Sequence, residues 1–327
     1  MNKSILLTGA TGFIGRNVAR VLASKKQDFA VLVRPGTNST KLKDLTDKCE
    51  IVELDLSSVD SLKDFLDKSK FETVIHIGAL RGGRKYPQKT YYDTNVKATE
   101  QIILNCLKND SKLLFCSSVG VYGAIPQELP ANVNTVYQSD NFYHYTKIKA
   151  ESIIKKYALS GLKSVILRPT ITYGENDYGF PYTLVKLIHR KLLLLPDLAI
   201  RIHLAHINTV VEAFYKLAVE DYTGNKIYNI ADPSPVKLKE LVDFISHRLR
   251  DNPYPENRYI SARKFRKITT LCQRYGFNSL HTKLRLINYS WFYDVTPSYK
   301  ELTIQPRKTI PEFKIVIDWY KKIHHIK

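Results

Sequence analysis

Residues 3–15 read Lys3-Ser-Ile-Leu-Leu-Thr-Gly-Ala-Thr-Gly-Phe-Ile-Gly15, an apolar strand that turns sharply into a helix. Three glycines in this turn, Gly9, Gly12 and Gly15, let the backbone come within contact distance of a diphosphate. The N–H groups and the dipole of the following helix N-terminus favour an anion there. The stretch therefore predicts a dinucleotide-binding fold. Because the spacing is G-x-x-G-x-x-G and not the commoner G-x-G-x-x-G, a glycine-rich turn without a ligand stays an alternative at this point.

Apolar, β-rich runs alternate with helical patterns over the first 170 residues. The expected strands are Ile5–Thr8, Phe29–Val33, Ile51–Leu54, Thr73–Ile77, Leu113–Ser117 and Ser164–Leu167. The expected helices between them include Phe13–Lys25, Ser58–Lys68, Gln88–Leu107 and Phe142–Leu159. This alternation predicts an α/β, Rossmann-type fold, a doubly wound parallel sheet with helices on both faces and ligands beyond the carboxyl ends of the strands.

After Pro169 the pattern loosens, because glycines and prolines interrupt it. We expect residues 1–170 to form the dinucleotide-binding domain. Residues 171–327 should form mainly a smaller, partly interleaved C-terminal substrate lobe, with some segments returning to the Rossmann core. The segments assigned to this lobe are Leu198–Ile207, Lys226–Ile230 and a final helix at Thr309–Ile323.

The composition is that of an ordinary globular protein: 327 residues, of which 44% are hydrophobic and 25% charged. Four scattered cysteines without metal-ligand spacing, and no apparent signal peptide, favour reduced thiols and a cytoplasmic location. His203 and His206 stand three apart without further ligands, so we expect them to be structural and expect no metal. No apolar run approaches the roughly 18–20 residues that span a bilayer.

The charge is strongly positive, +19, and unevenly distributed. No acidic residue occurs from Asn257 to Tyr293, and the basic residues of this stretch are Arg258, Arg263, Lys264, Arg266, Lys267, Arg274, Lys283 and Arg285. Such a stretch could meet anionic lipid, nucleic acid or a nucleotide diphosphate, or simply form a solvated basic helical face. Because no nucleic-acid module accompanies the charge, we expect no nucleic-acid partner, and a peripheral membrane contact through residues 257–293 is the weaker hypothesis.

The second expected strand ends at Val33-Arg34, where an NAD-preferring site would carry an acid for the ribose hydroxyls. A guanidinium at Arg34 suits a 2′-phosphate instead, so NADP is the favoured cofactor and NAD the alternative. Asp55 and Leu56 follow the third strand, and Asp55 could face the adenine amino group. A solvent-facing Arg34 and an Asp55 that serves only the loop before a helix are the plain alternatives.

A tyrosine and a lysine, Tyr143 and Lys147, follow the serine-bearing end of the fifth strand, Ser117-Ser118. Tyr and Lys four apart lie on one helix face, and an ammonium beside a phenol lowers a phenol pKa that is ordinarily about 10. Such a phenol can exchange a proton with a carbinol or a carbonyl while hydride passes to or from a nicotinamide. Tyr145 and Lys149 have the same spacing, and only one pair can face the cofactor.

With these residues in place, the chain resembles the extended short-chain dehydrogenase/reductases. This group includes NAD(P)-dependent sugar epimerases and dehydratases, and dihydroflavonol- or hydroxysteroid-type reductases. The matching motifs are Thr8-Gly-Ala-Thr-Gly-Phe-Ile-Gly15, His76-Ile-Gly-Ala79, Asn95-Val-Lys-Ala-Thr99, Ser117-Ser-Val-Gly-Val-Tyr-Gly123, Tyr143-x-x-x-Lys147 with Glu151, and Arg168-Pro-Thr-Ile-Thr-Tyr-Gly174.

The resemblance implies which residues carry the chemistry. The family has an acid four residues after its catalytic lysine, and Glu151 stands there, which selects Tyr143 and Lys147. Measured from Val121-Tyr-Gly123, the family's catalytic serine falls on Ser118 and not on its neighbour. By this resemblance Tyr143 is the acid/base, Lys147 binds the nicotinamide ribose and tunes Tyr143, and Ser118 polarises the substrate oxygen.

The expected cofactor-binding residues are Gly9, Thr11, Gly12, Phe13, Ile14, Gly15, Arg34, Asp55, Leu56, Asn95, Lys147 and Arg168. The resemblance gives Asn95 a further role in ordering the active-site helix. It also suggests a homodimer through helices such as Gln88–Leu107 and Phe142–Leu159.

The function that the resemblance implies is that of an NAD(P)-dependent oxidoreductase, epimerase or dehydratase. It would act by hydride transfer at a hydroxyl- or carbonyl-bearing carbon of a small molecule, with a nucleotide sugar as the favoured substrate. One alternative is an NADPH-dependent carbonyl reductase of the dihydroflavonol or hydroxysteroid type. A non-catalytic NADP(H)-sensing protein on the same fold is the alternative from a different class.

Overall fold

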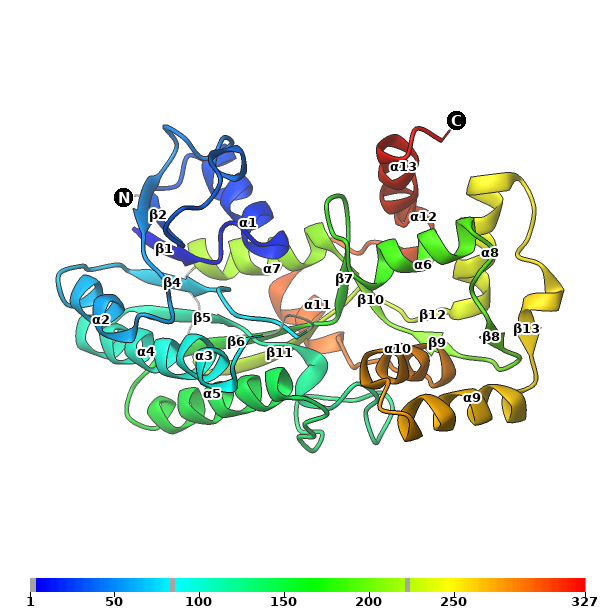
Figure 1. Ribbon diagram of the computed structural model, residues 1–327. Coiled ribbons are helices and arrows are strands. Elements are labelled where there is room, and N and C mark those ends of the chain that lie inside the picture. The colour runs from blue at the N-terminus through cyan, green and yellow to red at the C-terminus, as the bar shows by residue number, and fades with distance from the viewer. Residues whose placement is uncertain (1–3, 83–85, 221–223, 327) are drawn as a thin grey trace.

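A parallel sheet of seven strands forms the centre of the larger lobe in the computed structural model, which describes residues 4–82, 86–220 and 224–326 (Figure 1). The strand order is β11-β6-β5-β4-β1-β2-β3. The strands are β1 (Ile5–Thr8), β2 (Phe29–Val33), β3 (Glu50–Glu53), β4 (Thr73–His76), β5 (Lys112–Cys116), β6 (Lys163–Pro169) and β11 (Lys226–Ile230). The order reverses direction between β1 and β4, which is where such sheets bind ligands. The predicted doubly wound α/β fold is confirmed.

Helices cover both faces of this sheet because consecutive side chains of each strand point to opposite sides. Ile5 and Leu7 pack toward one helical layer, while Leu6 between them packs toward the other. The first layer contains α1 (Phe13–Ser24), α7 (Ile207–Val219) and α11 (Thr296–Leu302). The second contains α2 (Val59–Asp67), α3 (Gln88–Tyr92), α4 (Ala98–Asn109) and α5 (Phe142–Ala158). The strands β1, β2 and β4 are therefore buried along their whole length.

The smaller lobe has a separate apolar core, with the buried Tyr254, Phe265, Trp291 and Phe313 among its members. Its strands are β7 (Ile171–Tyr173), β8 (Leu195–Pro196), β9 (Arg201–Ile202), β10 (Leu204–His206), β12 (Val236–Lys237) and β13 (Tyr259–Ile260). Its helices are α6 (Phe180–His189), α8 (Leu238–Arg250), α9 (Ala262–Arg274), α10 (Asn278–Asn288), α12 (Thr309–Glu312) and α13 (Lys314–Ile323). None of the helices in the described ranges combines the length and the apolar character that crossing a bilayer requires.

Three sequence expectations about the elements were wrong in part. The segment Lys226–Ile230, assigned to the small lobe, is β11 and extends the main sheet beside β6. The helix expected over Gln88–Leu107 is interrupted by a π-helical turn at Asp93–Lys97. The final helix is divided at Phe313 into α12 and α13. The other predicted strands and helices of the first 170 residues match the structure to within two residues at each end.

Candidate active site

The glycine-rich turn between β1 and α1 has the shape that a dinucleotide diphosphate requires. Gly9 has a φ of +78°, and a Cβ there would lie 2.7 Å from the backbone nitrogen of Gly78 at the end of β4. A Cβ on Gly15 would collide with the carbonyl of Gly9, so only glycine lets α1 start this close to β1. Gly12, the residue before α1, is exposed. The chain therefore presents bare backbone and a helix N-terminus at the predicted position, and these residues fit a nicotinamide dinucleotide.

The remaining loop residues line the same turn. Thr11, Phe13 and Ile14 are all half-buried. The Phe13 ring lies close to Gly174: a Cβ added to Gly174 would be 3.1 Å from Cζ of Phe13. Gly174 follows β7, so this contact brings the small lobe to the edge of the cofactor turn. The predicted residues of the turn thus lie where the two lobes meet.

Of the two possible Tyr-Lys pairs, Tyr143 and Lys147 face the protein. Tyr143 is half-buried in the first turn of α5 and hydrogen-bonded to the hydroxyl of Ser118. Lys147 is only 3% exposed, and its Nζ donates to the carbonyl of Cys116 at 2.6 Å. The carbonyl of Cys116 belongs to the carboxyl end of β5, so the pair lies at the sheet edge where ligands bind.

The alternative pair lies on the outer side of α5. Tyr145 is 36% exposed and stacks on Phe142, with ring centroids 5.4 Å apart. The ammonium of the exposed Lys149 lies 5.5 Å from the Tyr145 ring centroid. Side chains two positions apart on a helix point in different directions, so Tyr145 and Lys149 cannot share a site with Tyr143 and Lys147. The geometry supports the choice of Tyr143 and Lys147.

The two serines at the end of β5 also separate into different roles. Ser118 accepts a hydrogen bond from the backbone N–H of Gly120 at 3.0 Å and contacts Tyr143. Ser117 instead donates to Oε1 of the buried Glu151 at 2.5 Å. This arrangement supports Ser118 as the serine of the site.

The pKa of Tyr143 differs from the expectation drawn from the sequence. Burial raises it above the ordinary value, the Cys116 thiol acts in the same direction, and Arg81 and the Ser118 hydrogen bond oppose them. Burial also lowers the pKa of Lys147. The ammonium of Lys147 is directed at the Cys116 carbonyl, so desolvation and not its charge dominates at the phenol.

Asn95 lies in the π-helical turn, and its amide joins two elements of the site. Its Oδ1 accepts from the N–H of Leu80 and its Nδ2 donates to the Leu80 carbonyl, both at 2.8 Å. The second hydrogen of Nδ2 goes to the hydroxyl of Thr146 on α5 at 3.0 Å. Because these bonds use both amide hydrogens, Asn95 is already satisfied by protein partners, and its direct contact with a cofactor stays a prediction. Its expected role in ordering the active-site helix agrees with this geometry.

Arg168, which is also among the predicted cofactor-binding residues, is likewise enclosed by protein. Its side chain is fully buried. The guanidinium donates to Glu151 through Nε at 2.9 Å and Nη2 at 2.5 Å, and to the hydroxyls of Tyr122 and Tyr137 at 2.5 and 2.6 Å. Arg168 joins β6 to α5 through Glu151, which lies four residues after Lys147. Its contact with a cofactor stays a prediction.

At the adenosine end of the turn the predicted residues take separate positions. Arg34 is exposed directly after β2, as a residue that contacts a 2′-phosphate would be. The Oδ1 of Asp55 accepts from the N–H and the hydroxyl of Ser57, at 2.8 and 2.9 Å. This bonding is the loop role that was the alternative for Asp55. The side chain of Leu56 lies over Gly78, since a Cβ added to Gly78 would be 2.6 Å from Cδ1 of Leu56.

An ion pair across the two lobes was not anticipated. Arg81, after β4, lies 3.8 Å from the buried carboxylate of Asp177 in the small-lobe loop after β7. Burial raises the pKa of Asp177, against the influence of Arg81 and of the Gly179 N–H. An acid in a glycine-bearing loop has no distinctive sequence signal. The Arg81-Gly-Gly-Arg84 stretch was expected to be a loop over the substrate; Arg81 and Gly82 adjoin Tyr143, and Gly83 and Arg84 lie outside the described residues.

Known proteins resemble this chain over most of its length. The model of the NAD dependent epimerase/dehydratase family matches residues 5–231. An Escherichia coli O157:H7 protein, N-acetyl-alpha-D-glucosaminyl-diphospho-ditrans,octacis-undecaprenol 4-epimerase, is 28% identical over 273 residues, 78% of this chain and 77% of the relative.

Solved structures share the fold over almost the whole chain. UDP-glucose 4-epimerase of Thermotoga maritima, solved with UDP-glucose, has a TM-score of 0.75 at 19% identity and covers 98% of this chain and 99% of its own. The Bordetella bronchiseptica enzyme WbmH, solved with NAD+, has a TM-score of 0.77 at 16% identity with the same coverage. Since the family model spans well over half of the chain, the protein belongs to the NAD-dependent epimerase/dehydratase family, as an enzyme of the extended short-chain dehydrogenase/reductase type.

Proposed function

We propose that this enzyme changes the configuration or oxidation state of a ring carbon in a sugar that is carried on a diphosphate. The names of its relatives support this substrate class, because they specify sugars joined to a nucleoside diphosphate or to diphospho-undecaprenol. The site supports the reaction class, since a phenol, a serine hydroxyl and a buried lysine come together at the carboxyl end of β5, the same edge of the sheet as the glycine turn after β1.

The chain's own residues would move the proton and hold the substrate. A bound nicotinamide dinucleotide supplies a hydride acceptor and donor. Tyr143 would take the proton from the sugar hydroxyl as the carbon is oxidised and return it on reduction. Ser118, already hydrogen-bonded to the phenol, would hold the same substrate oxygen. Lys147 would approach the nicotinamide ribose from α5, with Glu151 and Arg168 fixing the helix behind it.

The observation that carries this proposal is the separation of the two tyrosines, which allows a matched test. Tyr143→Phe should lower turnover of UDP-glucose or UDP-N-acetylglucosamine by about 10²–10⁴-fold, the range for a lost general acid/base, while dinucleotide binding persists. Tyr145→Phe, two residues away on the outer face, should stay within about twofold of the wild type. Products would be followed by proton NMR. Full activity of Tyr143→Phe together with loss in Tyr145→Phe would overturn the assignment.

We further propose that the cofactor is NADP(H) in preference to NAD(H). Arg34 supports this, and so does Arg16 in α1, whose buried Nε has no hydrogen-bond partner among the described residues. Titration of both cofactors should show NADP(H) binding more tightly to the wild type, and Arg34→Asp should reverse the order. Tighter binding of NAD(H) to the wild type would refute the preference.

Epimerases keep their cofactor bound through a cycle, whereas reductases exchange it. We therefore expect dinucleotide to remain with the protein after gel filtration, as detected by mass spectrometry of the denatured sample. Release of all dinucleotide, with steady consumption of NADPH in the presence of a hydrophobic carbonyl, would favour the alternative reductase.

The proposed homodimer would form through the layer of α4 and α5. Leu104 of α4 is 42% exposed, which supports that surface. Sedimentation equilibrium should give twice the chain mass of 37.7 kDa for the wild type and the chain mass for Leu104→Arg. A monomeric wild type would refute the dimer.

A further inference from the structure

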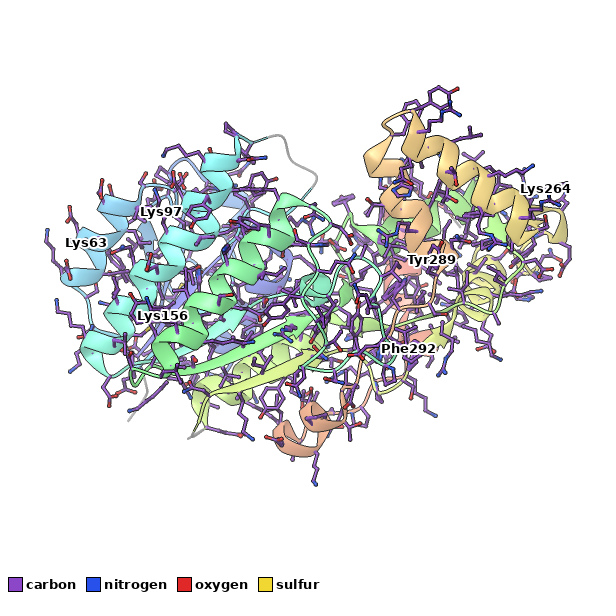
Figure 2. The ribbon with its side chains drawn as sticks, turned by 90° about the horizontal axis from the view of Figure 1, so that it is seen from below. Lys63, Lys97, Lys156, Lys264, Tyr289 and Phe292 are labelled. Carbon is purple, nitrogen blue, oxygen red and sulfur yellow. The ribbon has the colours of Figure 1, made fainter. Side chains whose placement is uncertain are left out.

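Helices α9 and α10 form a hairpin, residues 261–289, that lies along one side of the small lobe (Figure 1). α9 buries only Phe265 and Thr269 against the lobe. The rest of its surface is exposed or half-buried, and Figure 2 shows Lys264 at the outer end of this helix, far from the main sheet. The hairpin therefore offers a broad helical face that the fold itself does not cover.

This face is apolar as well as basic. Of the sixteen large apolar side chains that are exposed in the described part of the chain, six belong to the hairpin: Ile268, Leu271, Tyr275, Phe277, Leu280 and Tyr289. Tyr275 is 69% exposed and Phe277 60%. A merely solvated basic face would carry polar side chains at such positions, so exposed aromatic and aliphatic groups indicate a partner with an apolar interior.

The apolar and basic side chains of α9 form two adjoining stripes. Ile268 and Leu271 are spaced three apart and so share one face of α9, which also carries Lys264 at its start, and the exposed Tyr275 follows at the end of the helix. The exposed Arg263, Lys267 and Arg274 are spaced four and seven apart and share the next face. An apolar stripe bordered by cations is the pattern of a helix that lies in a membrane interface.

Charge complementarity identifies the partner's chemistry. From Asn257 to Tyr293 the sequence has no acid, and six of its basic side chains on the hairpin are exposed: Arg263, Lys264, Arg266, Lys267, Arg274 and Lys283. A cluster of this size is typical of segments that bind anionic headgroups. We propose that the α9–α10 hairpin docks on the surface of an anionic lipid bilayer.

The docking surface is joined to the active site by one ion pair. Arg285 of α10 lies 3.5 Å from Oδ1 of Asp140, and the next residue, Asn141, caps α5 by accepting from the N–H of His144 at 2.9 Å. Tyr143 is in that same first turn. A docked protein would thus have the loop that precedes α5 bonded to its docking hairpin, and its use on sugars carried at the bilayer surface is a consequence that rests on the proposed function.

Vesicle co-sedimentation of the full chain tests the docking. Wild type should sediment with vesicles of phosphatidylcholine containing about 30% phosphatidylglycerol at about 50 mM NaCl, and much less with phosphatidylcholine alone. Arg263→Gln/Lys267→Gln/Arg274→Gln should weaken binding by roughly 100-fold, because each cation is worth about fivefold. Leu271→Ser/Tyr275→Ser should lose the part of the binding that survives about 500 mM NaCl, since apolar contacts are not screened.

A control variant that loses the same number of cations elsewhere on the protein tests whether the attraction is unspecific. Lys63→Gln/Lys68→Gln/Lys156→Gln removes three exposed cations from the larger lobe, and Figure 2 shows Lys63 and Lys156 at the opposite end of the molecule from Lys264. This variant should bind vesicles within about twofold of wild type. Equal loss in both triple variants, no sedimentation of the wild type, or binding to single-stranded RNA but not to vesicles would overturn the proposal. Dinucleotide binding and sugar turnover are measured in every variant. A protein that docks on vesicles but turns over no sugar would refute the proposed function and leave the docking proposal standing.

Discussion

Close backbone contact at Gly15 is the residue-scale feature on which cofactor binding depends. Gly15→Ala should weaken dinucleotide binding at least about tenfold and destabilise the fold by about 1–3 kcal/mol, because the new methyl group meets the Gly9 carbonyl in a packed interior. Isothermal titration and denaturant unfolding measure the two effects. Gly82→Ala is the matched control, since its Cβ would have Tyr143 at an ordinary 3.9 Å. Equal effects in both variants would contradict the steric account.

A buried histidine links the cofactor turn to Asn95. The hydroxyl of Thr99 donates to the Asn95 carbonyl at 2.8 Å, so it accepts from Nε2 of His76, 3.0 Å away. The hydroxyl of Thr8 accepts from the N–H of Gly78 and donates to Nδ1 of His76 at 2.7 Å. These directions fix the neutral tautomer with its proton on Nε2.

This histidine should make stability depend on pH. Burial, together with the charge of Lys147, lowers the pKa of His76 to about 3, against about 6.5 in the unfolded chain. Below pH 6.5 this histidine takes up a proton in the unfolded state but stays neutral in the folded state. The free energy of unfolding therefore falls as the pH falls, by about 2 kcal/mol at pH 5. His76→Gln should shrink the difference in unfolding free energy between pH 7.5 and 5 by that amount. The same change at the exposed His247 is the control, and an unchanged difference in His76→Gln would refute the argument.

At the scale of elements, most of the large lobe could be predicted because apolar periodicity is local. The strands β1 and β2 begin and end at the predicted residues. The π-helical turn at Asp93–Lys97 could not be predicted, because no residue in it is a helix breaker. The bonds that Asn95 makes within it, to Leu80 and Thr146, join residues that are not neighbours in the sequence. The pairing of Lys226–Ile230 with β6 also joins residues far apart in the sequence.

Within the site, the family resemblance predicts which face of α5 carries the reacting residues, but it does not predict the residues that hold α5 in place. The Tyr143–Lys147 spacing follows from helix geometry and needs no structure. That Arg168 turns inward to Glu151 depends on where β6 lies beside α5, which spacing alone does not encode. The family resemblance predicts a cofactor contact for Arg168, whereas in the structure its guanidinium is bonded to Glu151 and to two tyrosine hydroxyls.

The buried pair that holds α5 to β6 should be costly to break. Burial alone would raise the pKa of Glu151, but hydrogen bonds and charge from Arg168 hold it below the ordinary value. Glu151→Ala leaves Arg168 unpaired inside the protein and should cost about 3–5 kcal/mol of unfolding free energy. Urea unfolding measures this. Asp44→Ala, which breaks the exposed pair with Arg20, is the control and should cost far less. A similar loss of unfolding free energy in Glu151→Ala and Asp44→Ala would show that burial does not make the Glu151–Arg168 pair more costly to break.

At the scale of the molecule, the two lobes are interleaved along the chain. α7 comes after residue 170 yet packs on α1 in the larger lobe, where Figure 1 shows the two helices together. Val210, Phe214 and Leu217 of α7 belong to the same apolar core as Ile5 and Leu7 of β1. A boundary at residue 170 therefore does not separate two packing units, because α7 and β11, both later in the chain, belong to the larger lobe.

Cutting the chain there gives a direct test. A fragment of residues 1–170 should fail to unfold cooperatively and fail to bind dinucleotide, because it exposes one face of the sheet that α7 covers and the edge of β6 that β11 pairs with. Refolding it together with a fragment of residues 171–327 should restore both properties, since the missing face and edge are then supplied. Circular dichroism against urea and dinucleotide titration would follow the recovery. Cooperative unfolding and dinucleotide binding by residues 1–170 alone would show that the first domain is independent of α7 and β11.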